Sequence, residues 1–394
     1  MNMNIYPVNI TTQKDIHDVC EKIGTDTRAL AYLVPKSRIL HLYADNIDFR
    51  AAGFLKQEML ARGGDVAVTK HVIDGKAERS DILVMATQTQ LRSLQEKLKA
   101  MDIWGLKEFR EKLAEVVKGL AVNEWTMISP AGHTITLSLN TKLMAILNLT
   151  PDSFFAESRI DEKGILSRAE ECLNDGAYIL DVGGESTRPG AEAVSESEEM
   201  TRLLPALKTL RKHFPDALIS IDTYKPEVAR MAVSEGADMI NDVSGFTFTE
   251  GMPEVIGELK VPYVLSHTTG SPQEMAKQES HEDIVRELQE YFSEKLAVLE
   301  DAGVRREQVI IDPGLGFGKG ERENFAVLKE IESLRVWGRP VLLGHSRKRF
   351  TGTERLAGSL GVSAMMAGRV SLLRVHDVKE NAAALRVGEA IRNA

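Results

Sequence analysis

The chain has 394 residues, 43% of them hydrophobic and 27% charged, with 30 Gly and 13 Pro, a balance typical of globular proteins. Fibrous, collagen-like and largely disordered classes are therefore excluded. At about 150 residues per domain, the length predicts two domains, or one large domain with an appendage. The 49 Lys and Arg face 58 Asp and Glu, so the formal charge of −9 gives no chain-wide reason to bind nucleic acid or an anionic membrane. An anionic substrate would need a local cluster of cations.

The two cysteines, Cys20 and Cys172, lie on apolar faces of helix-like segments. This position favours buried, reduced thiols over a disulfide or a metal site. The first residues lack the basic start and apolar core of a signal peptide, and no stretch approaches the ~20 apolar residues that span a bilayer. We therefore predict a cytoplasmic protein.

Residues 1–120 contain strand-like runs at 39–44, 65–69 and 81–87, with helical patterns at 49–64 and 91–101. This part is expected to be a small, separate α/β domain. It contains no motif with catalytic spacing. An oligomerising or stabilising module is the favoured interpretation, and a partner-binding or regulatory domain is the alternative.

Residues 121–394 begin with a segment that alternates apolar and polar residues around the turn Pro130-Ala131-Gly132, which predicts a β-hairpin at 125–140. We expect this hairpin to plug the lower end of the domain that follows. Helix-like segments then alternate with short, apolar, β-branched runs; Pro226, for example, suits the first turn of a helix in which Val228, Met231 and Ala232 line one face. Eight such runs occur, at 143–147, 178–182, 218–222, 239–243, 263–267, 309–313, 340–344 and 372–376.

Eight strand–helix units in about 250 residues predict a (β/α)₈ TIM barrel, with an open, doubly wound sheet as the structural alternative. In such barrels the chemistry lies at the C-terminal ends of the strands. Those ends are rich in polar residues here, which a barrel built only for stability would not need. They are Asn148, 181–188, Asp222, Asn241, Asp242, His267, Asp312, 346–348 and 374–377.

Two chemistries are combined at these strand ends. A carboxylate, an amide and a second carboxylate, from Asp222, Asn241 and Asp312, suit a flat heterocycle that presents N–H donors beside a carbonyl. A cationic group suits a phosphate or diphosphate. Its members are Arg188, Arg347, Lys348, Arg374 and His376.

Familiar catalytic motifs do not account for these residues. The segment 314–320 lacks the first Gly and the final Ser or Thr of a phosphate-binding P-loop. Lys348 replaces the second Gly that a hydrolase nucleophile elbow needs, so Ser346 is not expected to be an acylating nucleophile. The histidines and cysteines form no recognisable zinc motif.

Seven motifs resemble, in this order, those of the dihydropteroate synthases, a family of the folate pathway. They are ILNLTPDSF (146–154), DVGGESTRPGA (181–191), SIDTYKPEVA (220–229), INDVSG (240–245), IDPGLGFGK (311–319), GHSRKRF (344–350) and RVHDV (374–378). The resemblance implies a pterin-binding barrel that joins a 7,8-dihydropterin methyl diphosphate to 4-aminobenzoate and releases diphosphate. It also implies Mg²⁺ as cofactor, small-molecule substrates and a homodimer.

By this resemblance, Asp222, Asn241, Asp312 and Lys348 would bind the pterin, with Phe317 packing nearby. Arg374 and His376 would hold the diphosphate, and Asn148 its Mg²⁺. Ser346, expected at the start of the helix after the seventh strand, would bind the aminobenzoate carboxylate, where backbone N–H groups and the helix dipole favour an anion. Segments 149–160 and 184–192 would close over the site. Thr187, Arg188 and Pro189 would form the aminobenzoate pocket, and Gly344 completes the expected substrate-binding set.

The chain departs from the family pattern at 155–158, at 265–272 and at His345, and these departures are expected to touch the rim of the site. Two other classes compete with a synthase. A pterin-dependent methyltransferase would share the Asp, Asn, Asp set but would not need the anion-binding residues. A non-catalytic pterin-binding relative would fit only the altered loops.

Overall fold

The computed structural model describes residues 3–149, 155–156, 159–160, 162–185, 194–269 and 281–393. The chain divides into two compact units, Met1–Val117 and Lys118–Ala394, and the division falls within helix α5. None of the described helices is long and apolar enough to cross a membrane. Cys20 and Cys172 are buried and free, as predicted.

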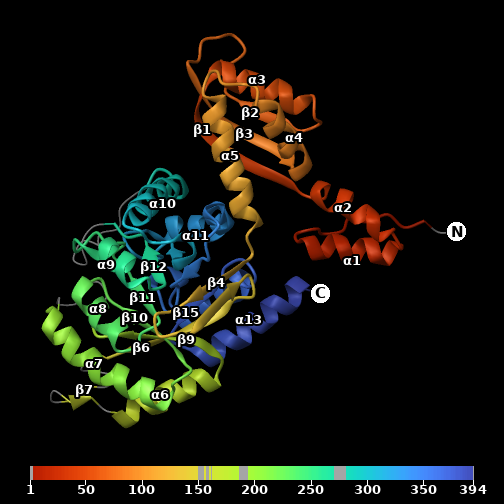
Figure 1. The fold of residues 1–394 in the computed structure, drawn as a ribbon. Coiled ribbons are helices and arrows are strands. Elements are labelled where there is room, and N and C mark those ends of the chain that lie inside the picture. Colours follow the sequence, from red (N-terminus) through yellow and green to blue (C-terminus); the bar gives the residue numbers. More distant parts are fainter. Residues whose placement is uncertain are drawn as a thin grey trace. The chain divides into compact units, whose positions relative to one another are not determined.

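The first unit is a three-stranded antiparallel sheet in the order β1-β3-β2, with helices beside it (Figure 1). Its core forms where apolar residues of α3 and α4, such as Leu55 and Leu94, pack with Val84 of the central strand. Thr87 and Gln90 form a capping box that starts α4 directly after the strand. The elements are α1 (Gln13–Ile23), η1 (Thr27–Ala29), α2 (Leu30–Leu33), η2 (Val34–Lys36), β1 (Ile39–Asp48), α3 (Phe49–Leu60), β2 (Asp65–Val68), β3 (Arg79–Thr87), α4 (Gln88–Leu98) and α5 (Leu106–Ala121).

The second unit is a (β/α)₈ barrel, and all eight predicted runs form its strands (Figure 1). Its first half contains β4 (Glu124–Ile128), β5 (Thr134–Ser138), β6 (Lys142–Asn148), β7 (Phe155–Ala156), β8 (Arg159–Ile160), α6 (Glu162–Asn174), β9 (Ala177–Gly183), α7 (Glu196–His213), β10 (Leu218–Asp222), α8 (Pro226–Ser234) and β11 (Met239–Asp242). Its second half contains α9 (Met252–Leu259), β12 (Tyr263–Ser266), α10 (Ile284–Asp301), η3 (Arg306–Gln308), β13 (Val309–Asp312), α11 (Glu321–Lys329), η4 (Ile331–Trp337), β14 (Leu342–Leu343), η5 (Arg349–Thr351), α12 (Arg355–Met366), β15 (Leu372–Val375) and α13 (Val378–Asn393).

The sheet is closed, which excludes the open, doubly wound alternative. Seven parallel pairings run in the order β13-β12-β11-β10-β9-β6-β15-β14. The ring closes through a parallel bridge between Ile311 and Val341, where the Ile311 amide donates to the Pro340 carbonyl at 3.0 Å. Pro340 has no N–H to give back to the ladder, which fits the brevity of β14.

The strands sort their residues by the period of two that a β-strand imposes. Outward-facing residues such as Leu180, Ile219 and Leu373 pack against the surrounding helices in one large core. Inward-facing residues near the strand starts form a second apolar cluster inside the barrel. It contains Met144, Ile179, Leu218, Met239, Val264, Ile310, Leu342 and Leu372.

The predicted hairpin, β4 and β5, covers this inner cluster from below. Trp125, Met127, Ile135 and Leu137 belong to the same cluster as the inward-facing strand residues. The hairpin therefore plugs the lower end of the barrel, as expected. The barrel interior is sealed on one side, so a ligand can reach it only from the C-terminal ends of the strands.

Candidate active site

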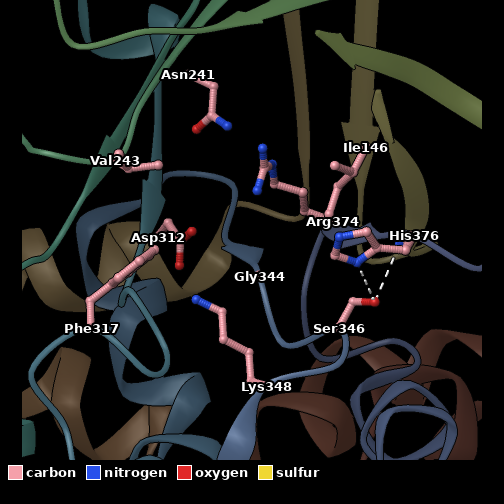
Figure 2. Close-up of a pocket in the computed structure, with 10 residues that line it drawn as sticks. All are labelled: Ile146, Asn241, Val243, Asp312, Phe317, Gly344, Ser346, Lys348, Arg374 and His376. Carbon is pink, nitrogen blue, oxygen red and sulfur yellow. Dashed lines mark hydrogen bonds between the residues drawn. The ribbon is translucent and has the colours of Figure 1, made fainter. Parts of the chain in front are cut away.

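Two residues after each apolar inner position, most strands carry a polar or small residue that also faces inward. On β10, Leu218 is followed on the same face by Ser220 and Asp222. On β15, Leu372 is followed by Arg374. These residues surround a cavity at the C-terminal ends of the strands (Figure 2). It is lined by Ile146, Asn241, Val243, Asp312, Phe317, Gly344, Ser346, Lys348, Arg374 and His376.

Arg374 is held by two buried carboxylates. Its Nε donates to Asp181 Oδ2 at 2.6 Å and its Nη2 to Asp222 Oδ2 at 2.5 Å. Burial raises the pKa of Asp222 to about 7, although Arg374 opposes the rise. These bonds use two of the five guanidinium N–H groups. The arrangement fixes Arg374 in the barrel mouth, and Asp222, predicted to bind the pterin, is not among the residues that line the cavity.

Asp312 and Lys348 face the cavity from neighbouring strand ends (Figure 2). Asp312 Oδ1 accepts the Gly314 amide at 2.8 Å, which orients the carboxylate. Burial raises the pKa of Asp312 and lowers that of Lys348 to about 8. The Lys348 Nζ lies 3.6 Å from the centroid of the Phe317 ring, a cation–π contact. A side chain at Gly316 would place its Cβ 2.9 Å from Lys348 Cδ, so glycine is needed to leave room for this lysine.

The remaining polar lining residues are also held in place. Asn241 Nδ2 donates to Asp181 Oδ2 at 3.1 Å, which couples the amide to the Arg374 pair. Ser346 Oγ lies 3.1 Å from His376 Nδ1 and accepts the His376 amide at 3.2 Å (Figure 2). The structure thus brings together, around one cavity, most of the residues that the sequence pointed to.

Several buried oxygens here have no hydrogen-bond partner within the described part of the chain. They are Oδ1 of Asp181, Oδ1 of Asp222, and Oγ of Ser220 and Ser266. All four residues face inward from the barrel strands. Buried polar atoms are normally hydrogen-bonded, so such a group inside a cavity mouth is typical of a surface built to receive a polar ligand.

Three sequence expectations need correction. No α-helix begins at Ser346: the short 3₁₀ turn η5 starts at Arg349 and α12 only at Arg355, because Arg347 adopts a left-handed backbone (φ 57°) that stops a helix from forming there. Arg347 is not with the other cations; it is exposed and its Nε pairs with Asp377 at 2.9 Å. His345 is buried and lies 2.8 Å from Ser363 Oγ, away from the rim.

Some predicted residues lie outside the described part of the chain. Thr187, Arg188 and Pro189 are among them, together with most of the segments 149–160 and 184–192. Asn148 is described: it ends β6, half-buried. A Cβ placed on Gly183 would lie 3.5 Å from Asn148 Oδ1 and 3.7 Å from Asp222 Oδ2, so the two oxygens face one region of the barrel mouth.

A second buried cluster, around Lys319, is not predicted by the sequence. Lys319 Nζ lies 2.8 Å from His267 Nδ1 and donates to the carbonyl of Gly314 at 3.0 Å. Burial lowers the pKa of Lys319 to about 7 and that of His267 to about 4. The His267 imidazole is therefore uncharged at neutral pH. His267 is a predicted strand-end residue, and Lys319 ends the motif at 311–319, but neither the rejected P-loop pattern nor that motif indicates that the two side chains meet.

Comparison with known proteins supports the architecture of the second unit and identifies its family. Residues 144–376 match the family model described as pterin binding enzyme. A dihydropteroate synthase of Escherichia coli is 40% identical over 276 residues, which cover 67% of this chain and 95% of the relative. A solved dihydropteroate synthase of Xanthomonas albilineans, determined with 4-aminobenzoic acid, superposes with a TM-score of 0.61 at 37% identity and covers 68% of this chain and 99% of its own.

A longer match is found in a probable bifunctional folylpolyglutamate synthase/dihydropteroate synthase of Halobacterium salinarum, 38% identical over 355 residues. It covers 88% of this chain but only 42% of the relative, so this chain spans less than half of that protein. A match of this length exceeds the barrel and extends into the N-terminal unit. With the family model covering more than half of the chain, and the Escherichia coli relative covered almost completely, the chain belongs to the pterin-binding enzymes and, among them, to the dihydropteroate synthase family.

Proposed function

We propose that this chain is a dihydropteroate synthase, which condenses 7,8-dihydropterin-6-ylmethyl diphosphate with 4-aminobenzoate to give 7,8-dihydropteroate and diphosphate. One observation carries the proposal: a ring-binding set and a cation set line the same cavity. Asn241, Asp312 and Lys348 belong to the first set, and Arg374 and His376 to the second.

The pterin ring binds between the strand ends of β11 and β13. The Asp312 carboxylate accepts from the ring's N–H donors, and the Asn241 amide, oriented by Asp181, hydrogen-bonds the ring edge. Ile146 and Val243 supply apolar walls for the faces of the ring. Lys348, protonated below pH about 8, donates to a ring acceptor.

The diphosphate binds on the opposite side of the cavity. Arg374 offers the N–H groups that its two carboxylates do not use, and His376 and Ser346 lie beside it. Diphosphate is a good leaving group when its charge is offset, so the carbon–oxygen bond breaks and its electron pair leaves with the diphosphate. Positive charge then develops on the pterin methylene and ring, where the carboxylates of Asp222 and Asp312 stabilise it.

The acceptor needs positioning more than activation. An arylamine is neutral at pH 7, so its nitrogen can form the new carbon–nitrogen bond and then lose a proton without a strong base. Phe317, Ser346 and Lys348 line the same cavity (Figure 2), and the Ser346 hydroxyl would bind the carboxylate of the aminobenzoate. Thr187, Arg188 and Pro189 complete the acceptor pocket in this proposal.

The site fits a Mg²⁺ ion that arrives with the diphosphate. The described residues contain no cluster of three or more His, Cys, Asp or Glu side chains that would form a complete protein cage. Asn148 can give one oxygen, and Mg²⁺ commonly takes its other ligands from phosphate and water. The mouth holds three carboxylates, Asp181, Asp222 and Asp312, so an incoming anion benefits from a divalent counter-charge. When bound, the ion would offset charge on the leaving diphosphate.

A homodimer and a cytoplasmic location remain predictions. The experiment that tests the proposed function is diphosphate release by the purified protein, given Mg²⁺ and dihydropterin methyl diphosphate, with and without 4-aminobenzoate. We expect release that depends on aminobenzoate, with dihydropteroate formed in equal amount. Pterin binding without product, or release that ignores the acceptor, would refute the assignment.

A further inference from the structure

A short turn after β13 sets the position of two residues that line the cavity (Figure 2). At its start, the Gly314 amide donates to Asp312 Oδ1 at 2.8 Å. At its end, the Phe317 ring lies with its centroid 3.6 Å from the Lys348 Nζ. The Gly314 carbonyl accepts the Phe317 amide at 3.2 Å, which closes the turn. The conformation of this turn therefore determines where the Asp312 carboxylate and the Phe317 ring lie.

Lys319 binds both ends of this turn. Its Nζ donates to the carbonyl of Gly314 at 3.0 Å and to the carbonyl of Phe317 at 3.2 Å. Lys319 is only 3% exposed, and the described residues that line the cavity do not include it. Burial lowers the pKa of Lys319 to about 7, but an uncharged amine still has two N–H groups. Both carbonyls therefore keep a donor in either protonation state.

The third contact of Lys319 connects the turn to the neighbouring strand. His267 follows β12 directly, and its Nδ1 lies 2.8 Å from the Lys319 Nζ. The His267 amide donates to the Asp312 carbonyl at 2.8 Å, which continues the pairing of β12 with β13. When Nδ1 accepts from the ammonium, the imidazole proton lies on Nε2, which is 3.6 Å from Glu287 Oε1. Glu287 is held in turn by His281 Nδ1 at 2.6 Å. The partner of Lys319 is thus itself fixed.

The backbone of the turn leaves little room for another conformation. Gly314 has a φ of 62°, and a Cβ there would collide with the carbonyl oxygen of His267. The Gly316 amide donates to Asn324 Oδ1 at 2.7 Å. Asn324 therefore holds the middle of the turn and Lys319 its two ends. Loss of the lysine would leave two buried carbonyls without this donor, which is costly unless the turn moves.

We propose that Lys319 is a positioning residue for the pterin substrate. By bonding the carbonyls of Gly314 and Phe317, it holds the Asp312 carboxylate and the Phe317 ring in the arrangement that binds the ring. This inference rests on the proposed function, which assigns Asp312 to the pterin. Lys319 also acts on Asp312 through its charge, since it opposes the rise that burial causes in the pKa of that carboxyl. The test must therefore separate position from charge.

The first experiment compares Lys319→Met with a matched control, Arg339→Met. Arg339 is also a buried cation, with a side chain 2% exposed; it donates to the Arg306 carbonyl and pairs with Glu300 at 3.1 Å. It precedes β14, at the plugged end of the barrel. In a calorimetric titration with dihydropterin methyl diphosphate and Mg²⁺, without acceptor, we expect the Kd to rise about tenfold or more in Lys319→Met. The Kd should stay at the wild-type value in folded Arg339→Met.

A double-mutant cycle separates position from charge. Phe317 carries no charge, so a coupling between it and Lys319 reports on the position of the turn. The tenfold effect of Lys319→Met should shrink to about threefold or less in a Phe317→Ala background. It should remain about tenfold in an Asn241→Ala background, because the Asn241 amide is held by Asp181 on another strand.

Two further measurements keep the inference testable. Should Lys319→Met fail to fold, Lys319→Gln retains an N–H donor on a side chain one atom shorter, which is too short to bond both carbonyls. A weaker pterin affinity is again expected. Hydrogen–deuterium exchange of a peptide that covers residues 314–318 should be faster in either Lys319 variant than in wild type and in Arg339→Met.

Wild-type pterin affinity in a folded Lys319 variant would overturn the positioning role, as would an equal loss of affinity in Arg339→Met. So would an undiminished effect in the Phe317→Ala background, or unchanged exchange of residues 314–318. These results would leave the proposed function intact as long as the wild-type protein forms dihydropteroate. Failure of the wild-type protein to bind the pterin or to form that product would instead refute the proposed function, and the positioning role with it.

Discussion

The lower and upper halves of the barrel interior use the same strands for opposite purposes. On β10, Leu218 packs in the apolar cluster above the hairpin, whereas Asp222, four residues later on the same face, pairs with Arg374. On β15, the same change from an apolar to a charged residue occurs between Leu372 and Arg374. The lower half is filled and closed by Trp125 and its neighbours, and the upper half is open and polar.

This contrast explains how a barrel can hold buried charges without losing its stability. Packing below supplies the apolar burial that keeps the strands in register. The strand ends are then free to carry carboxylates and cations, which burial makes costly unless they are paired. Substitutions in the two halves should therefore separate cleanly into those that affect activity and those that affect stability.

The largest effect on activity is expected from Asp222→Asn. The change removes one carboxylate from Arg374 and from the region where positive charge develops, so kcat should fall by about 10²–10³-fold. Asn is nearly isosteric and Asp181 still holds Arg374, so the fold should be retained. Steady-state rates and an unfolding curve on the same preparation check both parts; turnover within a few-fold of wild type would remove Asp222 from the site.

The largest effect on stability is expected from Leu218→Ala on the same strand. Truncating this buried side chain should lower the free energy of unfolding by about 2–5 kcal/mol, because the apolar cluster inside the barrel can refill the space only in part. At a temperature where the variant is folded, kcat should match wild type. Urea unfolding followed by barrel tryptophan fluorescence measures the first effect. A loss of turnover without loss of stability would contradict the division into two halves.

A pH dependence should arise from Lys348. Burial lowers its pKa to about 8, so the ammonium is present below that pH and is lost as the pH rises through it. The kcat/KM for the pterin diphosphate should therefore decline above pH about 8. In Lys348→Arg the cation persists at higher pH, so this decline should disappear even where the rate is lower. An identical alkaline decline in both proteins would assign it to another group.

The smallest effect is expected from deletion of residues 1–117. The Escherichia coli relative is covered over 95% of its length by 276 residues of similarity, which leaves little in it to correspond to this unit. The catalytic parameters of the barrel alone should stay within about threefold of the full chain. A folded but inactive barrel would instead implicate the N-terminal unit in the reaction.

The sequence predicts the barrel well because its signal is local. Each strand is a short apolar run and each helix has its own period, so all eight strands and the hairpin were predictable. Closure was not, because it depends on the meeting of Ile311 and Val341 at opposite ends of the strand order. Nor does an apolar run show which of its residues face inward, since parallel strands are buried on both faces.

For the site, the sequence could supply residues but not their pairing. The convergence of Asn241, Asp312 and Arg374 followed from their positions at strand ends. That Arg374 would bond Asp181 and Asp222, on strands far from it in the chain, could not be foreseen. The helix expected at Ser346 was wrong because local sequence did not reveal the left-handed turn at Arg347.

The most direct test of the central claim is a calorimetric titration of dihydropterin methyl diphosphate, without acceptor, into wild type, Asp312→Asn and Leu218→Ala. If the upper half of the barrel binds the pterin, affinity should fall at least about tenfold in Asp312→Asn and stay at the wild-type value in folded Leu218→Ala. Equal affinity in wild type and Asp312→Asn would contradict the claim, as would the absence of any binding to wild type.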